Sequence, residues 1–370
     1  MILLNDFARQ WEDTRDKALA AFGAVGESGW YVLGQQLRDF EVALAQFWGV
    51  RNCVGVASGL DAIEISLRSL GCKPGDKVLT TPLSAFATTL AILKIGAVPI
   101  FVDTDNFGLL DLDLCREVLE RRPDIRFLLP VHLYGHALDM NRLVLLREQF
   151  GCKIVEDCAQ SINASFEGTA TGHGSDMAAT SFYPTKNLGA LGDGGAILTN
   201  SEELSETARC LRNYGQSAKY HHNAVGYNSR LDELQAALLN RVYLPLVGGW
   251  TERRRQVARR YCDGIRNESV SVPGSPTGSH SCWHLFPIYT NPERKLSLIT
   301  HLRSNGILSA EHYPVAIPDQ PALNGKQFEV VGDLRRSRRI CQSEISIPIH
   351  PYLRDEEVSH VIDKCNRWNP

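Results

Sequence analysis

The sequence has no apolar run that approaches the roughly 18 consecutive residues a membrane-spanning helix requires. Its N-terminal segment MILLNDFARQWEDTRDK also lacks the unbroken apolar core of an export signal, because Asp6, Glu12, Asp13 and Asp16 interrupt it. These absences lead us to expect a cytoplasmic protein that does not associate with membranes.

An excess of one charge sign is also missing. The 39 Lys and Arg residues nearly balance the 42 Asp and Glu residues, for a net charge of -3. The chain therefore has no basic field to attract nucleic acid or an anionic membrane. Its ten cysteines include no C-x-x-C pair, so neither a zinc site nor a disulfide framework is indicated. We expect reduced, mostly buried thiols, no metal, and a partner that is a small molecule or a second copy of the chain.

What the sequence does contain is an alternation of short apolar runs with helical patterns. Residues 52–57 are a Val-rich run, and after Ser58-Gly59 the apolar residues recur at steps of three or four until Gly71, which predicts strand, tight turn and helix. The pattern continues with strands predicted at 77–80, 98–102, 127–131 and 153–155, and a helix at 84–95. Such alternation predicts an α/β fold with a large, mostly parallel sheet covered by helices on both faces, and ligands gather beyond the carboxyl ends of strands in such sheets.

The pattern changes after about residue 230. Residues 231–261 predict a long Arg-rich helix broken near Pro245 and Gly248-Gly249, and shorter mixed elements follow. The 370-residue length is typical of two or three domains. We therefore predict a large domain at 1–247 and a smaller α+β domain at 248–370.

Residues that could take part in catalysis or ligand binding lie at the predicted strand ends and turns. Asp157 follows the strand at 153–155, Lys186 stands among aromatic residues, Pro and Gly, and Gly59 and Leu60 open a helix whose free N–H groups could hold a phosphate. Taken singly, Asp157 could be a helix cap and Lys186 a surface lysine. Together with Phe86, which could stack on an aromatic ring, they supply the amine, acid and phosphate donors that pyridoxal 5'-phosphate (PLP) needs.

The chain also resembles a known family, the DegT/StrS-type nucleotide-sugar aminotransferases, which are PLP enzymes of the aspartate-aminotransferase fold. The resemblance runs almost end to end, through the motifs SGWYVLG (28–34), ASGLDAIE (57–64), VEDCAQS (155–161), SFYPTKNLGALGDGGA (181–196), RNYGQ (212–216), GYNSRLDELQAA (226–237) and HYPV (312–315). Two departures are Leu60, where the family often has Thr, and Leu83-Ser84-Ala85, where a more polar run is usual. Both affect details of cofactor binding and leave the lysine and the acid in place.

The resemblance implies a role for each matching residue. Lys186 matches the lysine that joins the cofactor and moves the proton, Asp157 the partner of the ring nitrogen, and Gln160 the residue near the ring's phenolic oxygen. Ser181 matches a phosphate ligand, as do Gly59 and Leu60. Asn228 matches a residue that reaches the phosphate from the neighbouring subunit, which implies a homodimer with shared active sites.

The resemblance also suggests the substrates. It implies L-glutamate as the amino donor and, from the segment around Lys219, a dTDP-linked 3-keto-6-deoxyhexose as the acceptor, with Tyr183, Lys219, His312 and Tyr313 as candidate substrate contacts. A 4-keto sugar aminotransferase acting on a dTDP- or UDP-sugar and a non-catalytic regulatory protein on the same fold are the alternatives. Family members that act as dehydratases have histidine in place of the lysine, and Lys186 argues against that activity.

Overall fold

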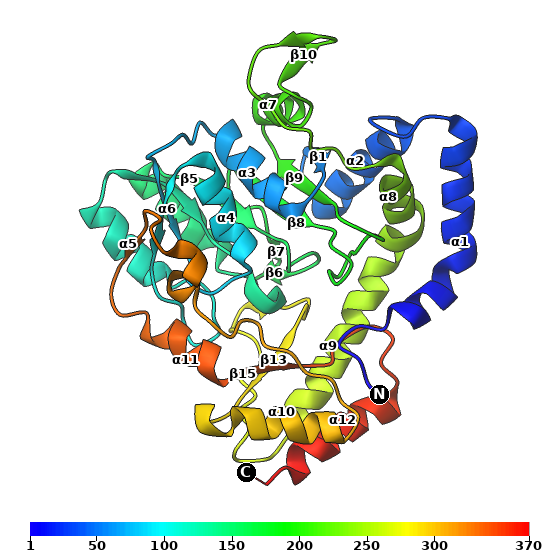
Figure 1. Ribbon diagram of the computed structural model, residues 1–370, viewed down its shortest axis with the longest axis vertical. Helices are drawn as coiled ribbons and strands as arrows, with labels where there is room; N and C mark the ends of the chain where they lie inside the picture. The colour runs from blue at the N-terminus through cyan, green and yellow to red at the C-terminus, as the bar shows by residue number, and fades with distance from the viewer. Residues whose placement is uncertain (370) are drawn as a thin grey trace.

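The computed structural model describes residues 1–369 and is built around one eight-stranded sheet (Figure 1). The strand order is β1-β9-β8-β5-β4-β2-β3-β14. The pairs from β8 through β14 are parallel, whereas β9 runs antiparallel to both β1 and β8. The bounds are β1 (Asn52–Val56), β2 (Lys77–Thr80), β3 (Val98–Phe101), β4 (Ile125–Leu129), β5 (Lys153–Asp157), β8 (Met177–Ser181), β9 (Gly195–Thr199) and β14 (Glu329–Val330). The predicted α/β fold with a large, mostly parallel sheet is confirmed.

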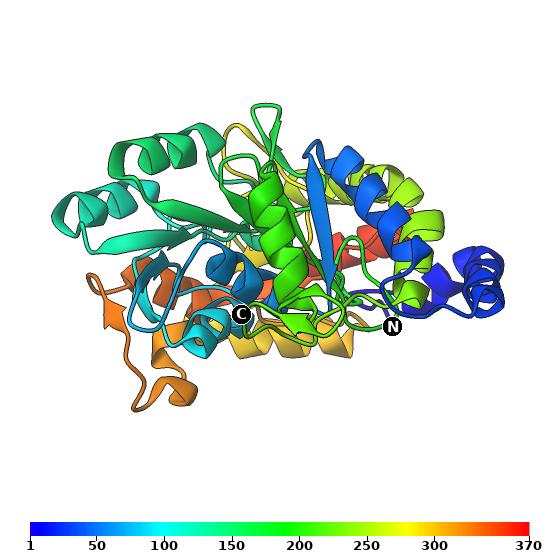
Figure 2. The same ribbon diagram turned by 90° about the horizontal axis from the view of Figure 1, so that it is seen from above.

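Helices cover both faces of this sheet (Figure 2). On one face α3 (Gly59–Ser69), α4 (Phe86–Ile95) and α7 (Glu202–Arg212) share a core with the inward side chains of the strands. On the other face α5 (Leu112–Arg121) and α6 (Met140–Phe150) do the same. Neighbouring residues of one strand divide between these cores, since Val78 belongs to the first and Leu79 to the second. This two-sided burial explains why the strands read as continuous apolar runs.

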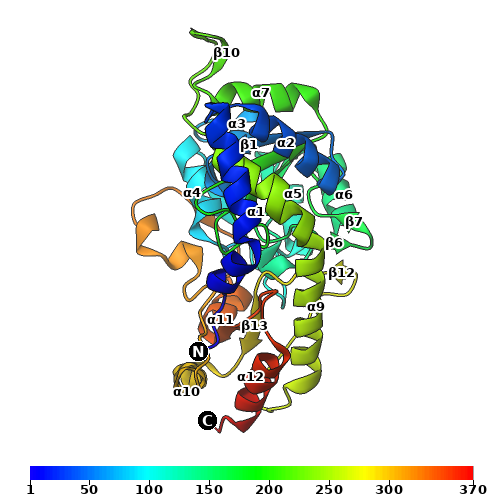
Figure 3. The ribbon, with the colours of Figure 1, turned by 90° about the vertical axis from the view of Figure 1, so that its right-hand side faces the viewer.

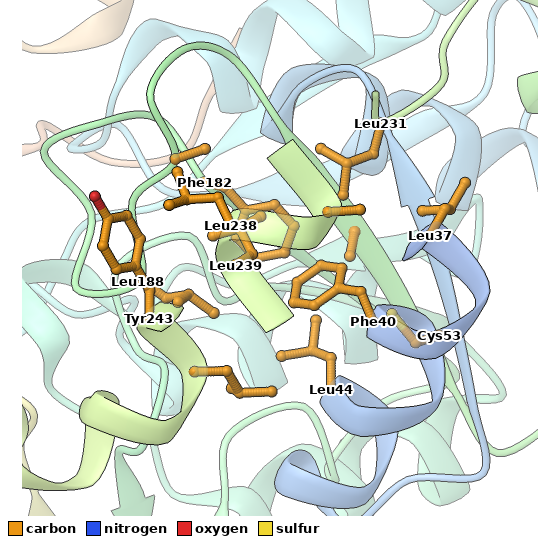
Figure 4. Close-up of a cluster of buried hydrophobic side chains, with 14 of the residues drawn as sticks. Leu37, Phe40, Leu44, Cys53, Phe182, Leu188, Leu231, Leu238, Leu239 and Tyr243 are labelled. Carbon is orange, nitrogen blue, oxygen red and sulfur yellow. The ribbon is translucent and has the colours of Figure 1, made fainter. Parts of the chain in front are cut away.

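A third core lies beside the antiparallel edge of the sheet, where α1 (Phe7–Ser28), α2 (Gln35–Trp48) and α8 (Glu233–Leu238) pack together. Figure 4 shows side chains of α2 and α8, among them Phe40 and Leu238, meeting Phe182 and Leu188. Those two residues flank the segment that contains Lys186. The loop carrying the candidate lysine is therefore anchored at both ends in a buried apolar cluster.

The C-terminal part of the chain has its own core. The antiparallel strands β13 (Phe286–Tyr289) and β15 (Glu344–Ile347) pack with α9 (Val247–Gly264), α10 (Lys295–Ser304) and α12 (Asp355–Arg367). Figure 3 shows α9 running from the level of the large sheet down to α12. The remaining α-helix and strands are short: α11 (Arg335–Ser343), β6 (Ser165–Phe166), β7 (Thr169–Ala170), β10 (Gln216–Ala218), β11 (His221–His222) and β12 (Ser279–His280). The predicted division at 247/248 coincides with the start of α9 and stays a prediction.

Several predicted boundaries need correction. The helix predicted from residue 84 begins at Phe86, because Ala85 is still extended with φ -56° and ψ 140°. The strand predicted at 127–131 ends at Leu129, before Pro130, which lacks the N–H that would continue the ladder. The strand predicted at 98–102 ends one residue early, at Phe101. The break near Pro245 is confirmed as a π-turn and a 3-10 turn over 239–246, but Gly248-Gly249 was wrongly assigned to it and lies inside the first turn of α9.

Two further expectations from the sequence can be compared with the fold. All ten cysteines are free and most of them are buried, as predicted. None of the helices in residues 1–369 combines the length and the hydrophobicity that crossing a bilayer takes.

The N-terminus of α2 is capped by a side chain from a distant part of the chain. Its N-cap residue is Gly34, which has no side chain, and the carboxylate of Glu233 in α8 takes over that role. Glu233 is 2% exposed and accepts hydrogen bonds from the N–H groups of Gly34 (2.8 Å), Gln36 (2.8 Å) and Leu37 (3.1 Å). A carboxylate satisfies these free donors and also interacts favourably with the positive end of the helix dipole.

Replacing Glu233 with Gln is expected to lower the free energy of unfolding by about 2 kcal/mol, because the amide is neutral and turns two donors of its own toward backbone N–H groups. Urea unfolding followed by circular dichroism measures the effect. The matched control is Glu148→Gln, since Glu148 is exposed on α6. Equal stability of the two variants would contradict the capping role.

Candidate active site

The candidate site begins at the carboxyl edge of the sheet, where β5 and β8 end side by side. β5 ends at Asp157, which pairs with Ala179 of β8, and β8 ends two residues later at Ser181. Ser181 in turn pairs with Gly195 of β9. Parallel pairing therefore brings an acid and a hydroxyl to one edge, as the sequence predicted for ligand-binding residues.

Asp157 is a buried acid that is held by two donors. Its side chain accepts hydrogen bonds from the Thr88 hydroxyl (2.8 Å) and from the N–H of Ala159 (3.1 Å), and the residue is 5% exposed. Burial raises the pKa of Asp157, while the two hydrogen bonds and the nearby charge of Lys186 oppose that rise. A buried carboxylate in this setting is stabilised by a cation placed beside it.

A chain of hydroxyl groups extends behind Asp157. Ser84 lies 2.7 Å from Thr88, oxygen to oxygen, and Thr88 contacts the carboxylate. When Asp157 is ionised it can only accept, so Thr88 donates to Asp157 and Ser84 donates to Thr88. The departure from the usual polar run before Phe86 therefore still provides one hydroxyl that fixes the orientation of this acid.

Lys186 lies in the loop between β8 and β9. Its backbone N–H donates to the carbonyl of Tyr183 (2.8 Å). At the base of the loop, the N–H of Phe182 donates to the carbonyl of Gly194 (2.8 Å). The side chain is half-buried, and no carboxylate of residues 1–369 lies within ion-pair distance of its amine. Burial lowers the pKa of Lys186 to about 8, and the charge of Asp157 only partly offsets that effect. The amine is thus partly neutral near physiological pH, as a nucleophile requires.

The start of α3 forms an anion cradle with Ser181. The hydroxyl of Ser58 caps the N–H of Asp61 (3.1 Å), and the N–H groups of Gly59 and Leu60 find no acceptor in the described part of the chain. A Cβ added at Gly59 would lie 2.6 Å from the Cβ of Ser181, so only glycine allows this close approach. Two free N–H groups at a helix N-terminus beside a hydroxyl suit a phosphate.

Gln160 connects this edge to the strap of residues 308–316. Its Oε1 accepts a hydrogen bond from the N–H of Tyr134 (2.6 Å), and its Nε2 donates to the hydroxyl of Tyr313 (3.3 Å). The Tyr134 hydroxyl donates to the carbonyl of His312 (2.6 Å). Gln160, His312 and Tyr313 are therefore brought together, and the charge of Lys186 lowers the pKa of His312 after the larger effect of burial.

Phe86 opens α4, two residues before Thr88. It is half-buried and packs against the apolar cluster of Phe101, Ile317, Leu323 and Leu334. Because Thr88 contacts Asp157, the same helix carries both the predicted stacking ring and the donor to the acid. This cluster gives Phe86 a fixed place near the acid.

Two residues next to Lys186 were missed by the sequence reasoning. Asn187 donates to the carbonyl of Cys282 (3.1 Å), and its Oδ1 lies 3.2 Å from the Nδ1 of His284. Burial and the charge of Lys186 together lower the pKa of His284 well below its ordinary value. Local sequence gave no signal for this pair, which joins residues 97 positions apart.

Apart from the backbone hydrogen bond to Tyr183, the other predicted residues make no hydrogen bond to Lys186 within the described chain. Lys219 lies on the hairpin of β10 and β11, which projects from the body at the top of Figure 1, and its amine sits 5.3 Å from the ring centre of Tyr220. Asn228 is exposed and bridges Asn213. Tyr183 is close to Lys186 in sequence but 53% exposed. Residues that contribute to the active site of a second copy of the chain are expected to be exposed in this way.

One group in residues 1–369 has the side chains of a metal site, namely His132, Glu156 and Cys158. Its lone pairs are already engaged, because Glu156 accepts from the N–H groups of Gly172 (2.8 Å) and Gly174 (2.9 Å) and lies 2.7 Å from His132. His132 Nδ1 accepts from the N–H of Leu138 (3.1 Å). These hydrogen bonds join separate segments of the chain and give the group a structural role. The absence of metal stays a prediction.

The residues at the sheet edge fit PLP. The buried acid, which makes no ion pair within residues 1–369, suits its ring nitrogen, the half-buried amine suits its aldehyde, and the helix N-terminus with free N–H groups suits its phosphate. The fold and the site define a PLP-dependent aminotransferase. A family model described as the DegT/DnrJ/EryC1/StrS aminotransferase family matches residues 12–366, and the chain belongs to that family.

Of three similar relatives, two are named as sugar aminotransferases and one as a regulatory protein. The chain is 40% identical to dTDP-3-amino-3,4,6-trideoxy-alpha-D-glucose transaminase of Streptomyces venezuelae, over 98% of this chain and 95% of that protein. It is 35% identical to UDP-N-acetyl-3-dehydro-alpha-D-glucosamine 3-aminotransferase of Acidithiobacillus ferrooxidans, over 98% and 96%. It is also 34% identical to a pleiotropic regulatory protein of Geobacillus stearothermophilus, over 97% and 96%.

Solved structures share the whole fold. DesV of Streptomyces venezuelae, in complex with a ketimine intermediate, superposes with a TM-score of 0.94 at 40% identity and covers 100% of this chain and 98% of that chain. NtdA of Bacillus subtilis, with bound cofactor PMP, superposes with a TM-score of 0.87 at 30% identity over 95% and 81%. The predicted family, fold, enzyme class and PLP cofactor are confirmed.

Proposed function

We propose that this protein transfers the amino group of L-glutamate to the keto group of a dTDP-linked 3-keto-6-deoxyhexose. The observation that carries the proposal is the buried carboxylate of Asp157 beside the half-buried, unpaired amine of Lys186, at the same sheet edge as the start of α3. The similarity to a dTDP-sugar transaminase over 98% of the chain supports the choice of nucleotide and of the 3-position.

Two side chains carry the chemistry in this proposal. PLP, when bound, supplies an aldehyde and an electron-accepting ring. Lys186 would hold the aldehyde through its amine and, once released, would carry a proton between the amine-bearing carbon of the substrate and the cofactor, in keeping with its lowered pKa of about 8. Asp157 stays ionised and holds a proton on the ring nitrogen, with Thr88 fixing its orientation.

The surrounding residues bind and orient the cofactor. Gly59 and Leu60 offer free N–H groups to the phosphate, and the Ser181 hydroxyl stands beside them. Phe86 stacks on the ring, and Gln160, whose Nε2 keeps one proton beyond the bond to Tyr313, donates to the phenolic oxygen. Tyr183, Lys219, His312 and Tyr313 contact the nucleotide sugar.

The proposal includes a homodimer with shared active sites. Asn228 and Lys219 are exposed, and Lys219 lies on the hairpin of β10 and β11, which projects from the body in Figure 1. Large apolar side chains are exposed as well, including Trp30 (62%), Tyr31 (55%) and Leu191 (48%). Burying such side chains against a second copy removes apolar surface from water and places Asn228 and Lys219 beside the partner's Lys186.

Mixing two inactive variants tests this arrangement. In a mixed dimer of Lys186→Ala with Asn228→Asp, one of the two shared sites has both native residues. Random exchange puts both variants in half of the dimers, so we expect about a quarter of the wild-type activity to return. Exchange without recovery of activity, or a monomer in analytical ultracentrifugation, would contradict the shared site.

The lowered pKa of Lys186 predicts the pH dependence of PLP uptake. The neutral amine is the attacking form, so uptake by the cofactor-free protein should rise with pH through about 8, whereas a solvated lysine titrates near about 10.4. Stopped-flow absorbance at a series of pH values measures the midpoint. A midpoint near that of free lysine would show that Lys186 is not desolvated.

A substrate panel tests the reaction itself. Purified protein with PLP and L-glutamate is assayed against dTDP- and UDP-linked 3-keto and 4-keto sugars, and formation of 2-oxoglutarate is followed. We expect the highest kcat/KM with a dTDP-linked 3-keto-6-deoxyhexose. Preference for a 4-keto sugar would favour the 4-keto sugar aminotransferase. Preference for a UDP-sugar would mean that the substrate carries UDP in place of dTDP.

The regulatory alternative makes a different prediction in a simpler experiment. A working aminotransferase with PLP is yellow, and its visible absorbance band disappears when L-glutamate is added. A colourless protein that ignores PLP would favour the regulatory role instead.

A further inference from the structure

His312 is held in the strap by three separate contacts. Its carbonyl accepts a hydrogen bond from the Tyr134 hydroxyl (2.6 Å) and its N–H donates to Oε2 of Glu344 (2.7 Å). Its ring nitrogen Nδ1 lies 2.9 Å from the hydroxyl of Ser346. The other ring nitrogen, Nε2, bonds to no residue of the described chain. The ring therefore has one nitrogen engaged in the protein and one left free.

Ser346 continues the contact from His312 to a buried acid. Its hydroxyl donates to Oε1 of Glu344 across 2.5 Å, and Glu344 and Ser346 are both 0% exposed on β15. The result is an unbroken hydrogen-bond chain of Glu344, Ser346 and His312. Glu344 accepts at both carboxylate oxygens, from the Ser346 hydroxyl at one and from the His312 N–H at the other.

The chemistry of these donors gives the chain a direction. Burial raises the pKa of Glu344 to about 7, so its carboxylate is ionised at a pH well above 7. An ionised carboxylate can only accept, so in that range the single proton of the Ser346 hydroxyl is used on Glu344. The oxygen of Ser346 is then left to accept, and the proton that it accepts must come from Nδ1 of His312. A neutral imidazole carries one N–H, so Nε2 is left as an acceptor.

We propose that Glu344 and Ser346 are positioning residues that fix His312 in the Nδ1–H tautomer, so that its Nε2 accepts a hydrogen bond from a sugar hydroxyl next to the reacting carbon. The inference rests on the proposed function for the identity of the sugar. It concerns two residues that touch neither cofactor nor substrate and act only through His312.

The position of His312 favours the sugar as the group it contacts. Tyr313, the next residue in the sequence, is held by Gln160. Burial and, to a smaller extent, the charge of Lys186 lower the pKa of His312 to about 4. The His312 ring is therefore neutral at physiological pH, and its tautomer decides whether Nε2 donates or accepts. A keto sugar presents hydroxyl donors beside its carbonyl, which match an acceptor.

Glu344→Gln tests the direction of the chain. The backbone N–H of His312 cannot reorient, so the amide oxygen of Gln must face it, and the amide NH₂ must then donate to Ser346. The Ser346 hydroxyl now donates to Nδ1 and forces the opposite, Nε2–H tautomer. The ¹⁵N shifts of the His312 ring, assigned by comparison with His312→Asn, report the tautomer in protein loaded with PLP. We expect Nδ1–H in the wild type and Nε2–H in Glu344→Gln, at a pH well above 7.

Kinetics separates a role in sugar binding from a merely structural one. In Glu344→Gln and Ser346→Ala we expect KM for the nucleotide sugar to rise about tenfold, which corresponds to one hydrogen bond, while the half-reaction with L-glutamate keeps its rate. Ser343→Ala is the matched control, because the buried Ser343 hydroxyl donates only to carbonyls of its own helix, those of Arg339 and Ile340. This control should change neither KM nor the tautomer.

Two results would overturn the inference. One is an Nε2–H ring in the wild type, and the other is an equal loss in both half-reactions, which would indicate a general packing defect. Failure of the wild type to use any keto sugar would overturn the proposed function instead. The tautomer measurement would still show whether the hydrogen-bond chain of Glu344 and Ser346 fixes the His312 ring.

Discussion

Replacing Lys186 with Ala is expected to abolish transamination while the protein stays folded. The lysine is both the group that holds the cofactor's aldehyde and the base that moves the proton, so no other residue of the site replaces it. The side chain makes no ion pair in the described structure, and the ends of its loop are anchored by Phe182 and Leu188. Truncating it therefore leaves the packing intact.

The measurement is 2-oxoglutarate formation by purified Lys186→Ala, with circular dichroism and thermal unfolding as checks on the fold. Lys326→Ala is the matched control, because Lys326 is an exposed lysine far along the chain. We expect the control to retain full activity. Turnover by Lys186→Ala at a rate similar to the wild type would remove Lys186 from the mechanism.

Asp157→Asn is expected to lower kcat by at least about 10²-fold, the size of effect seen when one preorganised electrostatic partner is lost. The substitution keeps the shape and one oxygen, which faces the N–H of Ala159, and the Thr88 hydroxyl can turn to accept from the new amide, so the local structure survives. What disappears is the negative charge that keeps a proton on the ring nitrogen in a buried setting. Single-turnover absorbance measurements with L-glutamate report the loss directly.

The matched control for this variant is Asp103→Asn. Asp103 is 7% exposed and accepts hydrogen bonds from the N–H groups of Arg336 and Ser337 (both 2.9 Å), at the start of α11. It shares burial with Asp157 but not the site, so we expect a loss of stability with unchanged activity per folded molecule. Equal activities of the two variants would mean that Asp157 is not at the ring nitrogen.

Residues whose role depends on local order were predictable from the sequence. Asp157 follows an apolar run, Gly59 opens a helix after a strand, and Lys186 lies in a Gly- and Pro-rich loop, so the pattern of neighbours alone places each at a strand end, a helix start or a turn. The parallel pairing of β5 with β8 then brings Asp157 and Ser181 together. For these residues the prediction needed no knowledge of distant contacts.

Residues that act through long-range contacts were not predictable in this way. Thr88 meets Asp157 across 69 positions, and His312 meets Ser346 across 34. Their sequence neighbourhoods read as an ordinary helix and an ordinary buried strand, so no periodicity marks them. The same limit applies to the antiparallel course of β9, which follows from its two neighbours, and to the cap of α2 by Glu233 across 199 positions.

The central claim is that the amine of Lys186 holds the PLP aldehyde. Purified protein loaded with PLP is treated with sodium borohydride, which makes that linkage permanent, and is then digested and analysed by mass spectrometry. We predict the phosphopyridoxyl mass on the peptide that contains Lys186, and its loss after treatment with excess L-glutamate before the reduction. A modification confined to another lysine, or none at all in a protein that retains activity, would contradict the account.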